Sequence, residues 1–134
     1  MSVSPLYLEF HDGRISMVTA NSSRVVVGFD HLSGYFPTME PNSYEVRSCR
    51  VTMTMERGVR FAANLGLHDR LYVSDGRISA DGVEVVLGAR LQLEGKCLMQ
   101  LFLMEGEAIT VEGPRIDVRI EEVGPIVSHF RGVL

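Results

Sequence analysis

Apolar and polar residues alternate with a period of two along most of the chain, and the apolar positions are rich in β-branched and aromatic residues. This alternation is typical of half-buried β-strands, in which successive side chains point to opposite faces of a sheet. Turn-forming residues separate the runs. The predicted strands lie within residues 7–10, 14–19, 24–29, 44–55, 71–73, 83–87, 97–104, 108–113, 115–123 and 126–134.

Helical periodicity is weak by comparison. No window carries an apolar stripe of helical period over three turns, and the best helical candidate, residues 60–69, is interrupted by Gly66. In the long run 44–55, the alternation changes phase near the middle, which indicates a bulge or a bend. The sequence therefore predicts an all-β protein, built as a barrel or a sandwich.

Two breaks divide the predicted strands. Residues 30–43 contain two prolines, a glycine and several turn formers, and predict one long loop. A second break lies at residues 56–58. The chain is thus divided into an N-terminal β segment, residues 1–54, and a C-terminal β unit, residues 55–134. Strands of the first segment alone bury little apolar surface, so both parts are compatible with one shared core.

The pentapeptide DGRIS occurs twice, at residues 12–16 and 75–79. Asp-Gly between two extended runs predicts a hairpin with a type I′ turn, because that turn needs positive φ at both central residues. Both copies are therefore predicted to be hairpin turns. Residues 24–28 also echo residues 83–88, so an ancient duplication is the alternative interpretation.

The composition is that of an ordinary globular protein, with 46% hydrophobic and 22% charged residues among 134. This length fits one domain with a proper core or two very small ones. The formal net charge of −4 provides no basic field that would hold a nucleic acid or an anionic membrane. The longest apolar stretch, residues 97–104, is too short to span a bilayer, so no membrane span is expected.

The first residues lack the basic region and apolar run of a secretory signal, so a cytoplasmic location is expected. Cys49 and Cys97 are then expected to be reduced thiols, with a single disulfide between them left open. No metal site is predicted, because the histidines are scattered through the sequence at His11, His31, His68 and His129.

The sequence does not predict a catalytic set. Glu121 and Glu122 are adjacent, so a strand would point them to opposite faces. Ser128 and His129 diverge in the same way, and no nucleophile elbow or phosphate-cradling glycine motif is present. We therefore expect a protein that is not an enzyme.

Close arginine pairs provide a candidate anion site. Arg47 lies near Arg50 in the sequence, and Arg57 lies near Arg60. Guanidinium groups bind phosphate oxygens in a bidentate geometry, which favours arginine over lysine for this task. The alternative interpretation is that these arginines are surface residues paired with neighbouring carboxylates.

From residue 57 onward, the order of features resembles a PilZ domain, a family of small β-barrels known for binding cyclic di-GMP. The family opens with the motif R-x-x-x-R. Arg60, followed by a phenylalanine, resembles the second arginine, and Arg57 is the nearest counterpart of the first. Residues 79–82, SADG, resemble the S-x-x-G of the family's second motif, and Arg77 stands at that motif's acidic or amide position.

The resemblance implies that residues 55–134 form a small antiparallel β-barrel, to which residues 1–54 add an N-terminal β segment. It also implies a non-catalytic receptor that binds cyclic di-GMP without a cofactor and relays this to a protein partner. Arg77 cannot accept a hydrogen bond, so it would contact a phosphate or a guanine edge instead. The implied ligand-binding residues are Arg57, Arg60, Arg77, Ser79 and Gly82.

Two other classes of function are open to a strand-rich chain. In a structural or assembly subunit, of a virus or a secretion apparatus, edge strands pair with neighbours or with further copies. Tyr35 and Phe36, exposed in the predicted loop, would then anchor a protein contact. A single-strand nucleic-acid binder is the third class, but the acidic total and the lack of tryptophan argue against it.

Overall fold

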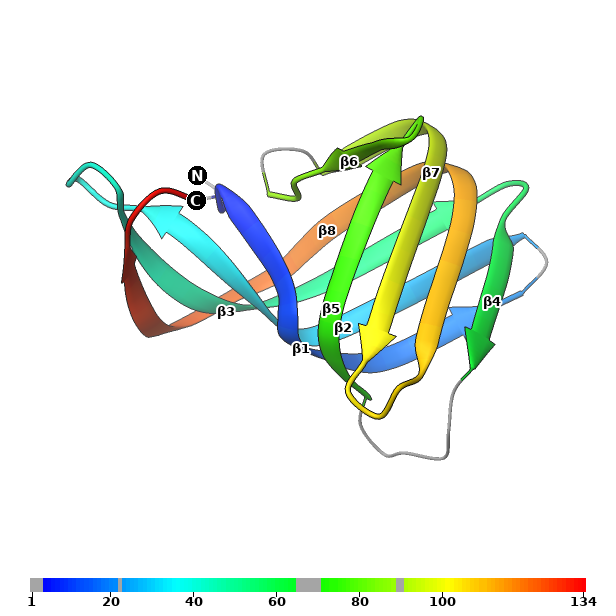
Figure 1. The fold of residues 1–134 in the computed structure, drawn as a ribbon, viewed down its shortest axis with the longest axis horizontal. Coiled ribbons are helices and arrows are strands. Elements are labelled where there is room, and N and C mark those ends of the chain that lie inside the picture. Colours follow the sequence, from blue (N-terminus) through cyan, green and yellow to red (C-terminus); the bar gives the residue numbers. More distant parts are fainter. Residues whose placement is uncertain (1–3, 22, 65–70, 89–90) are drawn as a thin grey trace.

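The computed structural model describes residues 4–21, 23–64, 71–88 and 91–134, and every regular element within these ranges is a β-strand (Figure 1). Neighbouring strands pair in antiparallel fashion. The predicted all-β fold is therefore confirmed. The strands are β1 (Tyr7–Ala20), β2 (Arg24–Pro37), β3 (Ser43–Glu56), β4 (Arg60–Asn64), β5 (Leu71–Ala80), β6 (Val83–Val85), β7 (Gln92–Leu103) and β8 (Ala108–Arg131).

Strands β1, β2, β3, β8, β7 and β5 form a ring in this order. The ring closes because β5 pairs back with β1, Arg14 lying opposite Tyr72 and Ile15 opposite Leu71. β6 extends the sheet beyond β5, and β4 pairs with β8 outside the ring. This ring-like closure is compatible with the predicted small β-barrel.

One hydrophobic core fills the ring and draws on both parts that the sequence separates. Phe29 and Met53 come from the first part and Leu101 and Ile109 from the second, and each is at most 1% exposed. Burying a side chain of this size stabilises the fold by about 1.5–3 kcal/mol relative to leaving it in water. Because β3 and β8 also pair along most of β3, the two parts share one core.

β2 runs into the predicted loop at residues 30–43, so that prediction is wrong, and only residues 38–42 connect β2 to β3. The turn-forming residues of this stretch alternate with buried ones. Phe36 is buried, and Gly34 packs so closely on Cys49 that an added Cβ would lie 2.9 Å from the sulfur. Packing against the neighbouring strand therefore overrides the local turn propensity.

The ends of β2, β3 and β8 extend together beyond the ring, at the left of Figure 1. We call this extension the arm, and it consists of residues 30–37, 43–50 and 121–131. Within the arm, β8 pairs only with β3 among the described residues. The other edge of β8 is therefore open over this part of its length.

Residues 60–64, the first half of the best helical candidate, form strand β4, and residues 65–69 lie outside the described residues. Phe61 and Ala63 lie opposite Val111 and Ile109 of β8. Pairing with an open strand edge satisfies the backbone donors and acceptors of this segment, and this outweighs the helix propensity of its alanines.

Both DGRIS segments lie inside strands, so the predicted hairpin turns at residues 12–13 and 75–76 are wrong. β1 runs through the first copy with Asp12 at a φ of 61°, and its register with β2 shifts there. The register between β5 and β7 shifts between Val73 and Asp75, directly before the second copy. The first copy therefore contains a β-bulge and the second follows one, and each bulge bends and twists its strand instead of reversing it.

The bulges place glycines where a side chain would not fit. A Cβ at Gly13 would lie 2.8 Å from the carbonyl oxygen of Phe10, and one at Gly76 would lie 2.8 Å from Cγ of the Phe10 ring. Beside these glycines, Nδ1 of His11 donates a hydrogen bond of 2.7 Å to the carbonyl oxygen of Ser74. The two bulges thus turn β1 and β5 toward each other where the ring closes.

The phase change predicted in residues 44–55 is present in β3. Val46 is buried on one face, whereas Cys49 and Val51 begin a series of buried residues on the other. The register shifts against both neighbouring strands in this stretch, and the extra residues belong to β2 and β8. The bend of β3 is therefore imposed by bulges in its neighbours.

We expect Gly76→Ala to lower the free energy of unfolding by about 1–3 kcal/mol, because the new methyl group would overlap the Phe10 ring and the Leu101 side chain. The matched control is Gly113→Ala, whose added Cβ would have its nearest neighbour at 3.7 Å. Urea denaturation followed by circular dichroism measures both variants. Equal stability of the two would contradict the steric role of Gly76.

Candidate functional site

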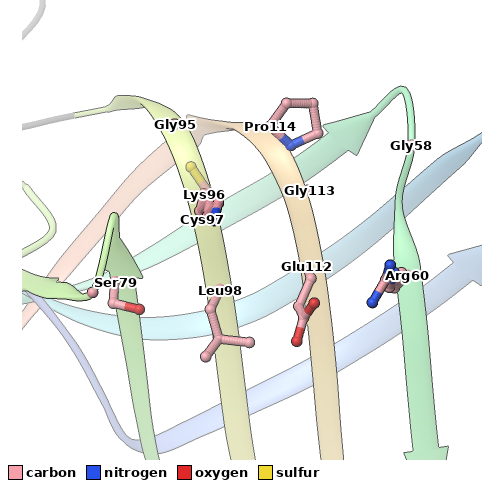
Figure 2. A pocket seen from close by; sticks show the side chains of 11 residues that line it. Gly58, Arg60, Ser79, Gly95, Lys96, Cys97, Leu98, Glu112, Gly113 and Pro114 are labelled. Atoms are coloured by element: carbon pink, nitrogen blue, oxygen red, sulfur yellow. The ribbon is translucent and has the colours of Figure 1, made fainter.

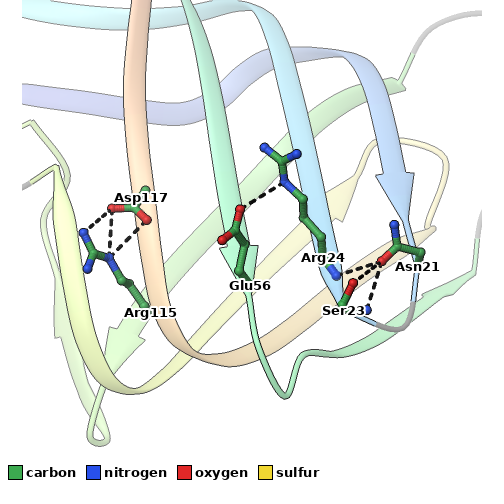
Figure 3. Close-up of polar contacts among 6 residues, drawn as sticks. All are labelled: Asn21, Ser23, Arg24, Glu56, Arg115 and Asp117. Carbon is green, nitrogen blue, oxygen red and sulfur yellow. Dashed lines mark hydrogen bonds and ion pairs between the residues drawn. The ribbon is translucent and has the colours of Figure 1, made fainter.

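A pocket of about 590 Å³ opens on the outer face of β5, β7, β8 and β4 (Figure 2). A row of direct cross-strand neighbours crosses it: Ser79 lies opposite Leu98, Leu98 opposite Glu112, and Glu112 opposite Arg60. Adjacent strands lie about 4.8 Å apart, so the row spans roughly 14 Å. These side chains face outward because they alternate along their strands with the buried residues Ile78, Met99 and Val111.

Glycines of positive φ lie at the rim of the pocket. Gly58, Gly82 and Gly95 have φ values of 61°, 81° and 113°. Gly95 lies inside β7, where the register with β8 shifts, and Asp81 holds this bulge, since its Oδ1 accepts a hydrogen bond of 2.8 Å from the backbone N–H of Lys96. The backbone N–H of Asp81 donates in turn to the Lys96 carbonyl oxygen at 3.0 Å. Lys96 is therefore held at the rim.

The structure brings three of the predicted ligand-binding residues, Arg60, Ser79 and Gly82, to this one pocket. Arg60 comes from β4, whereas Ser79 and Gly82 come from the end of β5 and the turn directly after it. Ser79 and Arg60 face the same hollow from its two sides (Figure 2). The fold thus brings Arg60 and the serine-glycine segment to one pocket.

The other two predicted residues do not line the pocket. Arg57 lies in the turn before β4 with a φ of 65°, and its side chain is exposed. Arg77 lies two residues before Ser79, on the same outer face of β5. Its guanidinium lies 5.7 Å from the centre of the Phe102 ring, in a cation–π contact.

Sequence reasoning missed two charged residues of the pocket, Glu112 and Lys96. Lys96 is the single lysine of the sequence and follows Gly95, and an isolated glycine within a strand pattern is a usable signal for a bulge. Glu112 lies at an outward position of the run 108–113, like many solvated glutamates. The strand register alone places it beside Arg60.

The charges of the pocket are available to a ligand. Arg60 and Glu112 are cross-strand neighbours of opposite charge, yet no ion pair joins them within the described residues. The Lys96 ammonium has no ion-pair partner in this part of the chain either. The guanidinium, the ammonium and the Ser79 hydroxyl can donate hydrogen bonds to an anion, while Leu98 offers an apolar surface between them.

The two cysteines are free thiols in the core, so the disulfide that the sequence left open is not formed. Burial raises the pKa of both thiols above the ordinary value of 9.0. Cys97 lies along the pocket wall but is only 2% exposed. A protonated, buried thiol packs as a small apolar group and is a poor nucleophile.

Phe36, predicted to be an exposed contact residue, is buried at 5% exposure, so that prediction is wrong. It points into the core because it occupies an inward position of β2, where a loop was expected. Tyr35 points the other way and is half-buried. It stacks at 5.5 Å from Tyr7 and 5.8 Å from Phe130, measured between ring centres, and its hydroxyl donates a hydrogen bond of 2.9 Å to Glu9.

The remaining arginines of the sequence-based anion hypothesis are surface residues away from the pocket. Arg47 pairs with Glu45 at 2.9 Å, and Arg50 pairs with Glu122 at 3.5 Å. Both pairs lie on the arm or its base, and exposed pairs of this kind contribute about 0–1 kcal/mol. Arg47 and Arg50 therefore fit the alternative interpretation, in which they are surface residues paired with neighbouring carboxylates.

No match is found between this chain and protein-family models, curated proteins or solved structures. The resemblance to PilZ domains therefore depends on the residues quoted above. Among the described residues, no helix is long and apolar enough to cross a bilayer. The same residues contain no group of three or more acidic, histidine or cysteine side chains placed to hold a metal ion.

We expect the Tyr35 hydroxyl to ionise well above its ordinary range, because burial and the hydrogen bond to Glu9 raise the pKa of Tyr35 from 10.0 to about 12. Since the folded-state pKa is the higher one, the neutral phenol favours the fold below pH 10.0, and this contribution is lost as pH rises through about 12. Ultraviolet titration of the wild type minus Tyr35→Phe measures this ionisation. A difference curve centred near the ordinary value would be the contrary result.

Proposed function

We propose that this chain is a non-catalytic binding module that takes a phosphate-bearing ligand in the outer-face pocket. The ligand class is cyclic dinucleotides, as the resemblance to PilZ domains implies, with cyclic di-GMP as the first candidate. The observation that carries the proposal is the convergence of Arg60, Ser79 and Gly82 on one pocket. Lys96 adds a second cation to the same pocket.

The pocket offers each part of such a ligand a matching group. The Arg60 guanidinium provides a bidentate contact for a phosphate, and Lys96 provides a point charge at the rim. The Ser79 hydroxyl can donate to a further oxygen. Leu98 lies between these polar groups and can pack against the face of a base. The volume of about 590 Å³ lies within the range usual for small-molecule sites.

Ligand binding is relayed through the segment that carries the arginines. Arg57 lies in the short connection between β3 and β4, and its side chain is exposed and without an ion pair in the described structure. A bound phosphate draws Arg57 toward the pocket and orders this connection. The surface next to β4 then differs between the free and the bound protein, and a protein partner binds one of these two surfaces in preference to the other. The free thiols support a reducing, cytoplasmic setting for this relay.

We expect isothermal calorimetry to detect binding of cyclic di-GMP, and Arg60→Ala to weaken it by at least about tenfold through loss of a charge-assisted contact. Arg119→Ala is the matched control, because Arg119 is 81% exposed and lies outside the pocket. Its affinity should equal that of the wild type. The proposal fails if the wild type gives no heat, or if both variants bind equally well.

A second candidate function, assembly through protein contacts, is favoured by an apolar strip on the arm. Val123, Ile126 and Val127 of β8 are 39%, 41% and 54% exposed. We propose that a second copy of the chain binds this strip. The β8 strands of the two copies would run antiparallel, with Ile126 of one copy facing Ile126 of the other. This arrangement places Glu121 of each copy opposite Arg131 of the other. Within one copy these residues pair with Arg119 at 3.6 Å and with Glu40 at 2.8 Å, so the dimer exchanges these partners for the ones across the interface. Because bulges interrupt β8 there, side chains and not a backbone ladder make the contact.

We expect Ile126→Asp to abolish a dimer that the wild type forms, as measured by sedimentation equilibrium over a range of concentrations. Val83→Asp is the control, since Val83 is 67% exposed on β6, away from the arm. Glu121→Arg and Arg131→Glu should each weaken the dimer, and the double variant should restore it. A wild type that stays monomeric at every concentration rules out this second function.

A further inference from the structure

Glu112 lies in the middle of the pocket, between Leu98 and Arg60 in the cross-strand row. Figure 2 shows its carboxylate on the strand next to Arg60, facing the same space. Cross-strand neighbours of opposite charge commonly form an ion pair. Here no ion pair joins them within the described chain, although both residues are exposed and have the length to reach each other. Both groups therefore remain free to act on a ligand.

A negative charge on the ligand feels both groups. Side chains at directly opposed positions start about 5 Å apart, so an anion bound to the Arg60 guanidinium lies near the Glu112 carboxylate as well. Arg60 attracts the first negative charge in a direct hydrogen-bonded contact. Each negative charge on the phosphate is repelled by the Glu112 carboxylate, so this repulsion is about twice as large for a doubly charged phosphate as for a singly charged one.

The other charged groups around the pocket do not cancel this effect. Arg77 and Glu84 flank Ser79 on the outer face and carry opposite charges. Asp81 is bound to the backbone of Lys96 at the far rim, so a carboxylate accompanies that cation too. Glu112 is the one carboxylate among the pocket-lining residues and the direct neighbour of Arg60.

We infer that Glu112 is a specificity-determining residue that weakens the binding of doubly charged phosphomonoesters more than that of singly charged phosphodiesters. The inference rests on the proposed function, because it assigns a ligand class to the same pocket. A phosphodiester carries one negative charge at neutral pH. A phosphomonoester carries close to two above its second pKa of about 6. The carboxylate thus shifts the selectivity of the pocket away from ordinary nucleotides with a terminal phosphate, which compete for Arg60.

The experiment compares two probes that share a base and differ in the phosphate: guanosine 3′,5′-cyclic monophosphate and guanosine 5′-monophosphate. Calorimetry at low ionic strength and about pH 8 keeps the monoester doubly charged. Glu112→Gln should raise the monoester affinity by about tenfold and change the diester affinity by less than about threefold. Glu112→Asp should keep the wild-type ratio of the two affinities, and high salt should reduce the effect of Glu112→Gln by screening.

Glu122→Gln provides the control, because Glu122 is an exposed carboxylate of the same strand that pairs with Arg50 outside the pocket. It should leave the ratio of the two affinities unchanged. If Glu112→Gln leaves the ratio of the two affinities as it was, the inference is wrong while the proposed function stands. If the two probes and cyclic di-GMP all fail to bind, the proposed function is wrong and the inference falls with it.

Discussion

The pairing of β1 with β5 is the contact on which the rest of the structure depends. In this contact Arg14 pairs with Tyr72 and Ile15 with Leu71. The hydrogen bond from His11 to the carbonyl oxygen of Ser74, also in β5, lies beside it. Without this contact the strands would form an open ribbon with one long apolar face in water, which a chain of this size cannot sustain. Closure brings that face onto itself and produces a single core from both ends of the chain. The same closure turns every alternate side chain outward and so decides which residues can meet a ligand.

The fold class follows from the sequence because alternation is a local property. Most predicted runs fall inside observed strands, and the phase change in residues 44–55 marks a bend that exists. The errors share one cause, which is that tertiary pairing overrode local propensity. Residues 30–37 have the composition of a loop but pair with β1 on one side and with β3 on the other. Asp-Gly is a hairpin signal in isolation, yet in this curved sheet the same two residues lie in a bulge of β1 and directly after a bulge of β5.

The candidate site was predictable only in part, for a physical reason. Arg60, Ser79 and Gly82 could be named because a short motif carries each of them. Glu112 and Lys96 have no such motif, and their role depends on which strand lies beside which and in what register. Register is set by the closed core and by bulges, and a shift of one residue would turn each outward side chain inward. Local sequence motifs therefore identify Arg60 and Ser79 but not the charged residues that the strand register places between or beside them.

Phe10 touches both copies of the repeated pentapeptide, through its carbonyl oxygen at Gly13 and its ring at Gly76. Positions 10 and 76 therefore do not vary independently, because the Phe10 side chain, together with Leu101, denies a methyl group to Gly76. A smaller residue at position 10 would relieve part of this crowding, so the two substitutions would be non-additive. Gly13 is different, since the group that crowds it is the backbone carbonyl of residue 10, which every substitution there retains.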